Sequence, residues 1–324
     1  MLQIPLIRTC LIRPWRVATR RHVNVTKTSS TTPYQSDDAS DLVNNLIQHT
    51  RALMLGSTQH LVAFSGGVDS SLVLALLQQA SISSQHVQPV LGISPAVSQE
   101  QILLARQVSS HLGFDLTEVR TEEGTDGMYI ANEGQACLAC KTHLYSCLKL
   151  VLDHTSQLAG GALYNGTNAD DTQDLTRLGL IAAADFSVLS PLEHTPKADV
   201  RRAAKHLGLP NWNYAASPCL RSRLALGVEA TQGHLQMIEE AESLAKNMLS
   251  GYNETSNLRV RMLSNQRARV EVDEELVAEA AELVPLWTPF FRELGFSAVQ
   301  VKAFKSGSVS RQLEEEQQPQ SAAM

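Results

Sequence analysis

The alternation of apolar and polar segments in the first two thirds of the chain predicts a parallel α/β sheet. Short apolar runs at 61–64, 87–93 and 115–119 have the length of strands, and the segments 70–80 and 98–112 carry apolar residues at helical spacing. A strand-helix-strand-helix-strand order requires a parallel sheet with covering helices on both faces. We therefore expect the carboxyl ends of the strands to share one edge, where such sheets bind ligands.

The same patterns extend this prediction in both directions along the chain. A helical pattern at 41–55 precedes the first strand, and a helix at 141–158 leads to a strand at 162–165. Val188 and Leu189 indicate one further short strand. We expect the loops that follow Phe64, Ile93 and Tyr164 to converge at the ligand-binding edge.

A different pattern follows Cys219 and predicts a small α+β domain. Helices are expected at 233–248 and 274–284, and strands at 257–263, 267–273 and 297–304. The end of the chain is too polar to bury and is expected to be disordered. The expected division is a leader at 1–36, an α/β domain at 41–223, an α+β domain at 231–304 and a tail at 305–324.

Charge is distributed unevenly between the leader and the rest of the chain. Residues 1–36 contain six basic side chains and no acidic one, which leaves 21 basic against 33 acidic residues in the remainder. An acid-free leader rich in Arg, Ser and Thr is typical of a transit peptide for the mitochondrial matrix or the plastid stroma. A basic arm for nucleic acid is the alternative, although the acidic body argues against a nucleic-acid partner. No apolar run approaches the roughly 20 residues that span a bilayer, so we expect no membrane partner.

A glycine- and serine-rich loop between the first strand and helix has the chemistry of a phosphate-binding site. Two glycines allow a tight turn and close approach to an anion, while serine hydroxyls and the first N–H groups of the helix donate to it. A carboxylate in the same loop can hold magnesium. An ordinary strand-to-helix turn with serine caps is the alternative. The loop consists of Ser65, Gly66, Gly67, Val68, Asp69, Ser70 and Ser71.

A second polar loop follows the strand at 162–165. Its amides, hydroxyl and paired carboxylates suit ribose and magnesium, although Asn, Gly and Asp are also ordinary turn residues. The expected nucleotide-binding residues here are Gly166, Thr167 and Asn168, and the expected magnesium ligands are Asp170 and Asp171 together with Asp69.

The cysteines after the leader require a metal or catalytic explanation, because an organellar interior disfavours disulfides. Cys137 and Cys140 form a C-x-x-C pair, which can hold an iron–sulfur cluster or zinc together with Cys219. Cys147 falls at helical spacing from Cys140 and is expected to be a buried apolar residue. Cys219 lies next to two arginines that would favour its nucleophilic thiolate.

Arginines near Cys219 and on the expected strand at 257–263 form a candidate anion-binding surface. Arg259 and Arg261 alternate, so both point to one face of the strand, where a substrate phosphate would suit them. The alternative is a solvated strand face that pairs with Glu271 and Asp273. We expect Arg221, Arg223, Arg259 and Arg261 to contact substrate.

The ordered set of motifs resembles the LarE-type ATP-dependent sulfur transferases, which belong to the PP-loop, or N-type, ATP pyrophosphatases. The segments that carry the resemblance are Phe64 to Ser70, Ser94-Pro95, Cys137 to Lys141, Gly166 to Asp171, Ser190 to Leu192, Leu207 to Pro210 and Ser217 to Arg223. Thr176-Arg177-Leu178-Gly179 departs from the family's usual Arg-Pro-Gly at this place.

The resemblance implies that ATP is cleaved to AMP and pyrophosphate to adenylate a substrate carboxylate, which then receives sulfur in nickel-pincer cofactor synthesis. It implies a homo-oligomer and a pyridinium biscarboxylate mononucleotide as substrate. Cys219 matches the family's essential cysteine, which is sacrificed in one branch. Cys137, Cys140 and Cys219 match a second branch that holds a 4Fe-4S cluster, and we expect this chain to belong to that branch and to hold such a cluster on these three cysteines. The rivals are a tRNA-thiolating or amidating PP-loop enzyme and a non-catalytic nucleotide sensor.

Overall fold

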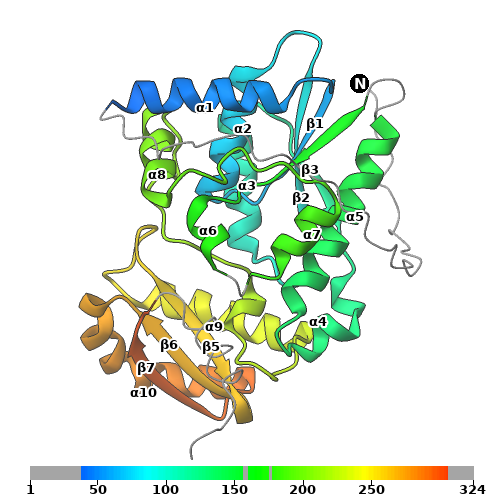
Figure 1. The fold of residues 1–324 in the computed structure, drawn as a ribbon. Coiled ribbons are helices and arrows are strands. Elements are labelled where there is room, and N and C mark those ends of the chain that lie inside the picture. The colour runs from blue at the N-terminus through cyan, green and yellow to red at the C-terminus, as the bar shows by residue number, and fades with distance from the viewer. Residues whose placement is uncertain (1–37, 156–159, 175–176, 306–324) are drawn as a thin grey trace, which may run out of the picture.

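The computed structural model describes residues 38–155, 160–174 and 177–305. Its larger sheet contains four parallel strands in the order β3-β2-β1-β4 (Figure 1). The strands are β1 (Gln59–Ala63), β2 (His86–Ile93), β3 (Thr117–Arg120) and β4 (Gly161–Tyr164). This sheet, with its flanking helices, confirms the predicted α/β class. Of the expected strand at Val188-Leu189, only a single bridge between Tyr164 and Leu189 is present.

Helices cover both faces of this sheet because successive strand residues point in opposite directions. Val62 packs into a core with α1, α2, α3 and α8, whereas Leu61 packs against α5 on the other face. The helices are α1 (Ala39–Leu53), α2 (Val68–Ala80), α3 (Gln99–His111), α5 (Ala136–Thr155), α7 (Gly179–Asp185) and α8 (Lys197–His206). α2 is buried along nearly its whole length, so its N-terminus is held firmly at the edge of the sheet.

Short elements link the sheet to the rest of the molecule, and the sequence patterns did not predict them. They are η1 (Glu123–Thr125), α4 (Gly127–Ala131), α6 (Ala169–Gln173) and η2 (Leu220–Arg223). Each is shorter than the window over which helical periodicity can be recognised. They matter for function because they hold several of the candidate site residues.

A second, mixed sheet follows η2 and is packed against two helices. β5 (Leu258–Leu263) pairs antiparallel with β6 (Arg267–Val272), which pairs parallel with β7 (Ala298–Ala303). α9 (Gln232–Met248) and α10 (Val277–Leu294) share one apolar core with these strands (Figure 1). α10 continues ten residues beyond the expected end at 284, through two prolines. Trp287 and Phe291 are fully buried there, so tertiary packing outweighs the local cost of proline.

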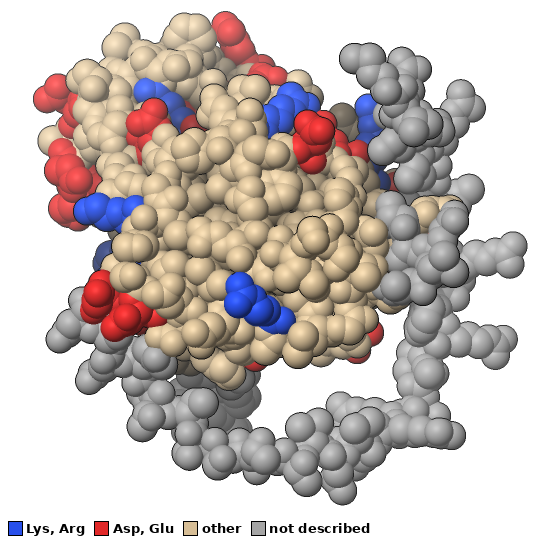
Figure 2. Space-filling view, turned by 90° about the horizontal axis from the view of Figure 1, so that it is seen from above, with Lys and Arg blue, Asp and Glu red and all other residues tan. Residues whose placement is uncertain are grey.

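The surface carries charges of both signs. On the face that Figure 2 shows, Lys and Arg lie among Asp and Glu and do not gather into one continuous basic area. Within the described ranges, every helix is too short or too polar to cross a lipid bilayer. The expected leader at 1–36 and nearly all of the expected tail at 305–324 lie outside the described residues.

Candidate active site

The glycine-rich loop after β1 turns sharply at Gly66. This residue has a φ of +73°, and a Cβ atom at this position would lie 2.6 Å from the Cα atom of Ala105 in α3. Both the left-handed backbone and the close approach therefore require glycine. The turn brings the chain directly to the N-terminus of α2, where Gly67 is the N-cap and no side chain of the described residues caps the helix. The first N–H groups of α2 thus remain available to an anion.

Hydroxyl groups brace this loop from within. The Ser70 hydroxyl accepts from the backbone N–H of Ser65 at 3.2 Å and donates to the carbonyl oxygen of Gly67 at 3.0 Å. Asn211, which follows α8, donates to the carbonyl oxygen of Gly66 at 2.6 Å and to the Ser71 hydroxyl at 3.1 Å. The loop is therefore preorganised, and Asn211 is a contributor that sequence reasoning missed.

The second polar loop lies directly against the first, as the parallel topology predicts. A Cβ atom at Gly166 would meet the backbone nitrogen of Ser70 at 2.7 Å. Asn168 caps α6 by accepting from the backbone N–H groups of Asp170 and Asp171. Its amide nitrogen also donates to Asp69 Oδ1 at 2.9 Å, which ties the two loops together.

The three acidic residues of these loops are accompanied by two cations. Lys197 at the start of α8 forms an ion pair with Asp69, and Arg177 pairs with Asp171 at 2.6 Å. Burial raises the pKa of Asp171, while the positive charge of Arg177 opposes this shift. Asp170 accepts from the backbone N–H of Lys197 at 3.3 Å. Lys197 was not anticipated, because nothing in the local sequence connects it to an acid 128 residues away.

The C-x-x-C pair lies in the first two turns of α5, and each thiol has a polar partner. The Arg221 guanidinium donates to Cys137 Sγ at 2.6 Å, and the Cys140 thiol donates to Glu123 Oε1 at 3.8 Å. Burial raises the pKa of both thiols; Arg221 opposes the shift at Cys137, and the Glu123 carboxylate adds to it at Cys140. The surroundings of both thiols therefore favour the protonated form.

Cys219 is exposed immediately before η2, and the structure brings it into the region of the C-x-x-C pair. The three sulfur atoms lie within electrostatic range of one another. In the part of the chain that the structure describes, however, no three His, Cys, Asp or Glu side chains stand close enough together to hold a metal ion. Cys147 is buried and its thiol donates to the carbonyl oxygen of Arg120, as expected for a packing residue.

The guanidinium groups of Arg221 and Arg223, the two arginines beside Cys219, bond to other groups of the protein. Arg223 is buried, forms an ion pair with Glu242 at 2.8 Å, and donates to the backbone carbonyl oxygen of Cys219 at 3.2 Å. Arg221 donates to Asn132 at 3.0 Å and to Cys137. The expectation that both side chains contact substrate stays a prediction.

The arginines of β5 also reach the Cys219 loop, but their surroundings differ. Arg261 is buried, pairs with Glu271 at 2.7 Å and donates to the carbonyl oxygen of Ser222 at 2.9 Å. Arg259 is half-buried and donates to the carbonyl oxygen of Ala216 at 3.2 Å. Burial, together with the neighbouring guanidinium groups, lowers the pKa of Arg259 to about 10. No ion pair with a carboxylate forms at Arg259 among residues 38–155, 160–174 and 177–305, so this guanidinium is the better anion receptor.

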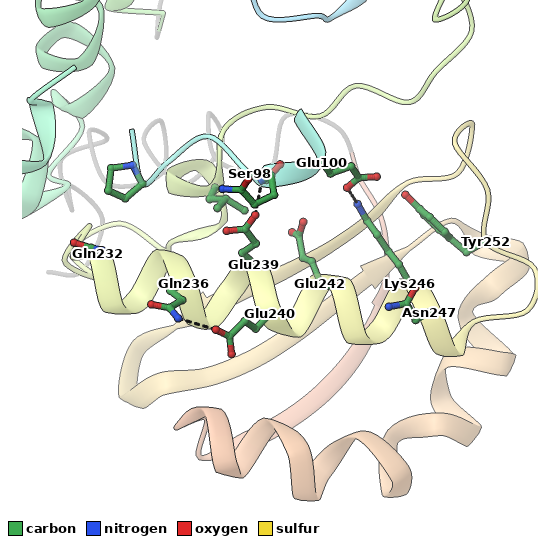
Figure 3. Close-up of a pocket in the computed structure, with 14 residues that line it drawn as sticks. Ser98, Glu100, Gln232, Gln236, Glu239, Glu240, Glu242, Lys246, Asn247 and Tyr252 are labelled. Carbon is green, nitrogen blue, oxygen red and sulfur yellow. Dashed lines mark hydrogen bonds and ion pairs between the residues drawn. The ribbon is translucent and has the colours of Figure 1, made fainter. Parts of the chain in front are cut away.

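A hollow lies beside α9, lined mainly by residues of α9 and of the start of α3. It has a volume of about 730 Å³, and Figure 3 shows Glu239, Glu242 and Lys246 along one wall and Ser98 and Glu100 opposite. Two contacts cross it: Lys246 pairs with Glu100, and the backbone N–H of Gln99 donates to Glu239 at 2.6 Å. These contacts join α3 of the α/β part to α9 of the second part.

A four-stranded parallel sheet with an open glycine-rich loop at the N-terminus of α2 defines a PP-loop nucleotide-binding α/β protein with a small additional α+β unit. No family model matches the sequence. Comparison with characterised and uncharacterised proteins nevertheless gives two informative relatives.

The uncharacterized protein slr1717 of Synechocystis sp. is 33% identical over 262 residues, which cover 78% of this chain and 92% of that protein. The pyridinium-3,5-bisthiocarboxylic acid mononucleotide synthase of Lactiplantibacillus plantarum is 28% identical over 253 residues, which cover 77% of this chain and 88% of that enzyme. The chain belongs to the LarE-type family.

Proposed function

We propose that this protein is an ATP-dependent, AMP-forming sulfur transferase. A substrate carboxylate attacks the α phosphorus of ATP, and pyrophosphate leaves toward the first N–H groups of α2 and the hydroxyls of Ser65, Ser70 and Ser71. A sulfur nucleophile then attacks the acyl-adenylate and displaces AMP, which gives a thiocarboxylate. The observation that carries the proposal is the uncapped, rigidly held N-terminus of α2, in a chain that also presents an exposed Cys219.

The residues of the two loops fit a magnesium ion that accompanies ATP. Magnesium is usually held by one or two carboxylates together with phosphate oxygens, and Asp69 and Asp171 lie within electrostatic range of each other. Bound magnesium would neutralise charge on the phosphates. Asp69 and Asp171 would hold it, with Asp170 close by. Lys197 supplies a second positive charge at the same edge, where the leaving pyrophosphate accumulates negative charge.

Cys219 is the proposed sulfur donor. Its sulfur attacks the acyl carbon as AMP leaves; loss of the Cα proton and cleavage of the Cβ–S bond then release the thiocarboxylate and leave dehydroalanine. The alternative source is a 4Fe-4S cluster on Cys137, Cys140 and Cys219. The three thiols suit such a cluster chemically, but in their present arrangement Arg221 and Glu123 contact two of them and no ligand set is formed within the described residues.

The substrate is proposed to be a pyridinium dicarboxylate mononucleotide, since the relative from Lactiplantibacillus plantarum is named for the bisthiocarboxylic acid of such a nucleotide. Arg259 is the proposed receptor for its phosphate. This guanidinium lies beside the Cys219 loop and has no carboxylate partner within the described residues. It could therefore pair with the substrate phosphate without competition from a carboxylate. We further propose that residues 1–36 direct the enzyme to an organelle and that it functions as a homo-oligomer.

Mass spectrometry of the purified chain, incubated with ATP and the dicarboxylate nucleotide with and without air, tests the proposal. The expected products are AMP, pyrophosphate and a thiocarboxylate. A sacrificed Cys219 becomes lighter by the mass of one hydrogen sulfide molecule after one turnover, whereas cluster chemistry gives repeated turnover and iron that is lost in Cys137→Ala. Formation of ADP and phosphate would contradict chemistry at the α phosphorus.

A further inference from the structure

A small cavity lies beside the cysteine region and adjoins the hollow along α9, with which it shares the wall residues Pro95 and Gln232. Its volume is about 220 Å³, below the roughly 300–1,000 Å³ of pockets that enclose a whole ligand. It therefore suits a single ring rather than a complete nucleotide. The loops after β2 and β3, together with η1, α4 and α9, supply its walls through Ser94, Pro95, Thr121, Glu123, Tyr129 and Leu235.

Two of these wall residues carry buried polar atoms that have no hydrogen-bond partner. Glu123 and Tyr129 are each only 2% exposed. Glu123 Oε1 accepts from the Cys140 thiol, whereas Glu123 Oε2 and the Tyr129 hydroxyl make no hydrogen bond within the described part of the chain. A buried carboxylate oxygen without a partner is unfavourable, and a ligand that brings positive charge would offset that cost.

The cavity adjoins the proposed sulfur donor. The backbone N–H of Leu220, the residue after Cys219, donates at 2.8 Å to the carbonyl oxygen of Ala96, next to the wall residue Pro95. Burial, followed by the charges of Cys219 and Cys140, raises the pKa of Tyr129, which places its hydroxyl within electrostatic range of both cysteines. A ring in this cavity would thus present a substituent toward Cys219.

We propose that this cavity receives the positively charged ring of the substrate, with Glu123 as its counter-ion and the Tyr129 hydroxyl as a donor to a ring carboxylate. The inference rests on the proposed function, which supplies a pyridinium ring beside the sulfur donor. A pyridinium ring carries a permanent positive charge that a neutral ring of the same shape lacks. Glu123 would therefore determine specificity, because a neutral ring leaves its carboxylate unpaired in a desolvated site.

Two probes separate ring charge from ring shape. One is pyridinium-3,5-dicarboxylate mononucleotide; the other is the isophthalate riboside phosphate in which carbon replaces the ring nitrogen. Their affinities are measured by calorimetry without ATP for the wild type, Glu123→Gln, Tyr129→Phe and the exposed control Glu133→Gln. The wild type and Glu133→Gln should bind the cationic probe about tenfold more tightly or better, as expected for a charge-assisted contact. Glu123→Gln should lose this preference, and Tyr129→Phe should weaken both probes while keeping it.

The inference is overturned if the wild type binds both probes with equal affinity, an outcome that does not depend on the folding of any variant. It is also overturned if folded Glu123→Gln keeps the full preference. The proposed function is tested separately by AMP and pyrophosphate formation. If the wild type forms AMP and pyrophosphate with both probes equally well, the proposed function is supported and the inference about the cavity is wrong. If the wild type prefers the cationic probe but forms neither AMP nor pyrophosphate, the proposed function is wrong and the inference about ring binding stands.

Discussion

The side-chain amide of Asn168 donates to the Asp69 carboxylate at 2.9 Å across 99 residues of sequence. Asn168 simultaneously caps α6, so the position of Asp69 depends on a second loop with its own local hydrogen bonds. This contact fixes the distance between the glycine-rich loop and the acidic loop. Together the two loops form one candidate site for ATP and magnesium.

Replacement of Asp69 by Asn should abolish formation of AMP and pyrophosphate without unfolding the chain. The substitution removes a magnesium ligand and the charge that pairs with Lys197, while it keeps the shape of the side chain. Pyrophosphate release and the thermal midpoint measure the two effects. Asp153→Asn is a matched control on the exposed side of α5 and should leave both unchanged. Normal pyrophosphate release by Asp69→Asn would remove this residue from the catalytic site.

Gly66→Ala should both destabilise the chain and prevent pyrophosphate formation. Its Cβ atom would meet the backbone of α3, and its left-handed φ adds strain. Gly113→Ala separates the two causes, because Gly113 has a similar φ of +78° but no atom within 4 Å of its ideal Cβ position. Urea denaturation should show a loss of roughly 1 kcal/mol for Gly113→Ala from strain alone and a larger loss for Gly66→Ala. Equal losses would show that the contact with Ala105 is relieved easily.

Replacement of the two arginines of β5 by alanine should have different effects on stability and on substrate binding. Arg261→Ala leaves the buried Glu271 carboxylate without its main partner, which should cost roughly 3–5 kcal/mol of folding free energy. Arg259→Ala should change stability much less and weaken binding of a phosphorylated substrate about tenfold or more, since it removes a charge-assisted contact. Denaturation and substrate KM report these effects, with exposed Arg267→Ala as the control. An unchanged KM for Arg259→Ala would exclude this arginine as the phosphate receptor.

Arg177→Ala should move the acidic limb of the activity profile to higher pH. Burial already raises the pKa of Asp171, and Arg177 opposes that shift, so its removal raises the pKa further. Asp171 would then take up a proton at a higher pH and lose the charge that holds magnesium. The profile of kcat/KM against pH, recorded at saturating magnesium for both proteins, measures the shift. A limb that stays in place or moves to lower pH would show that Asp171 does not control it.

Local patterns were sufficient to predict the elements that form the larger sheet and the loop at its edge. Apolar runs of strand length identify β1 to β4, and apolar residues at helical spacing identify α2, α3 and α5, because each signal is contained within a short stretch of sequence. The Ser65 to Ser71 loop could be recognised because glycines and hydroxyls at one strand-to-helix junction act together without distant partners. The parallel direction of the strands then follows from the helical connections between them.

Contacts between distant segments were decided only by the tertiary structure. The sequence alone indicated three cysteines and four arginines as site residues. In the folded chain Arg261 forms an ion pair with Glu271, Arg223 forms an ion pair with Glu242, and Arg221 donates a hydrogen bond to Cys137. It also places Lys197 on Asp69 and Glu123 beside Cys140. These partners are set by how whole elements pack against one another, and a buried charge takes whichever opposite charge the packing brings near. The sequence therefore determined which chemical groups are present, and only the packing of the elements decided which of them are left free to meet a ligand.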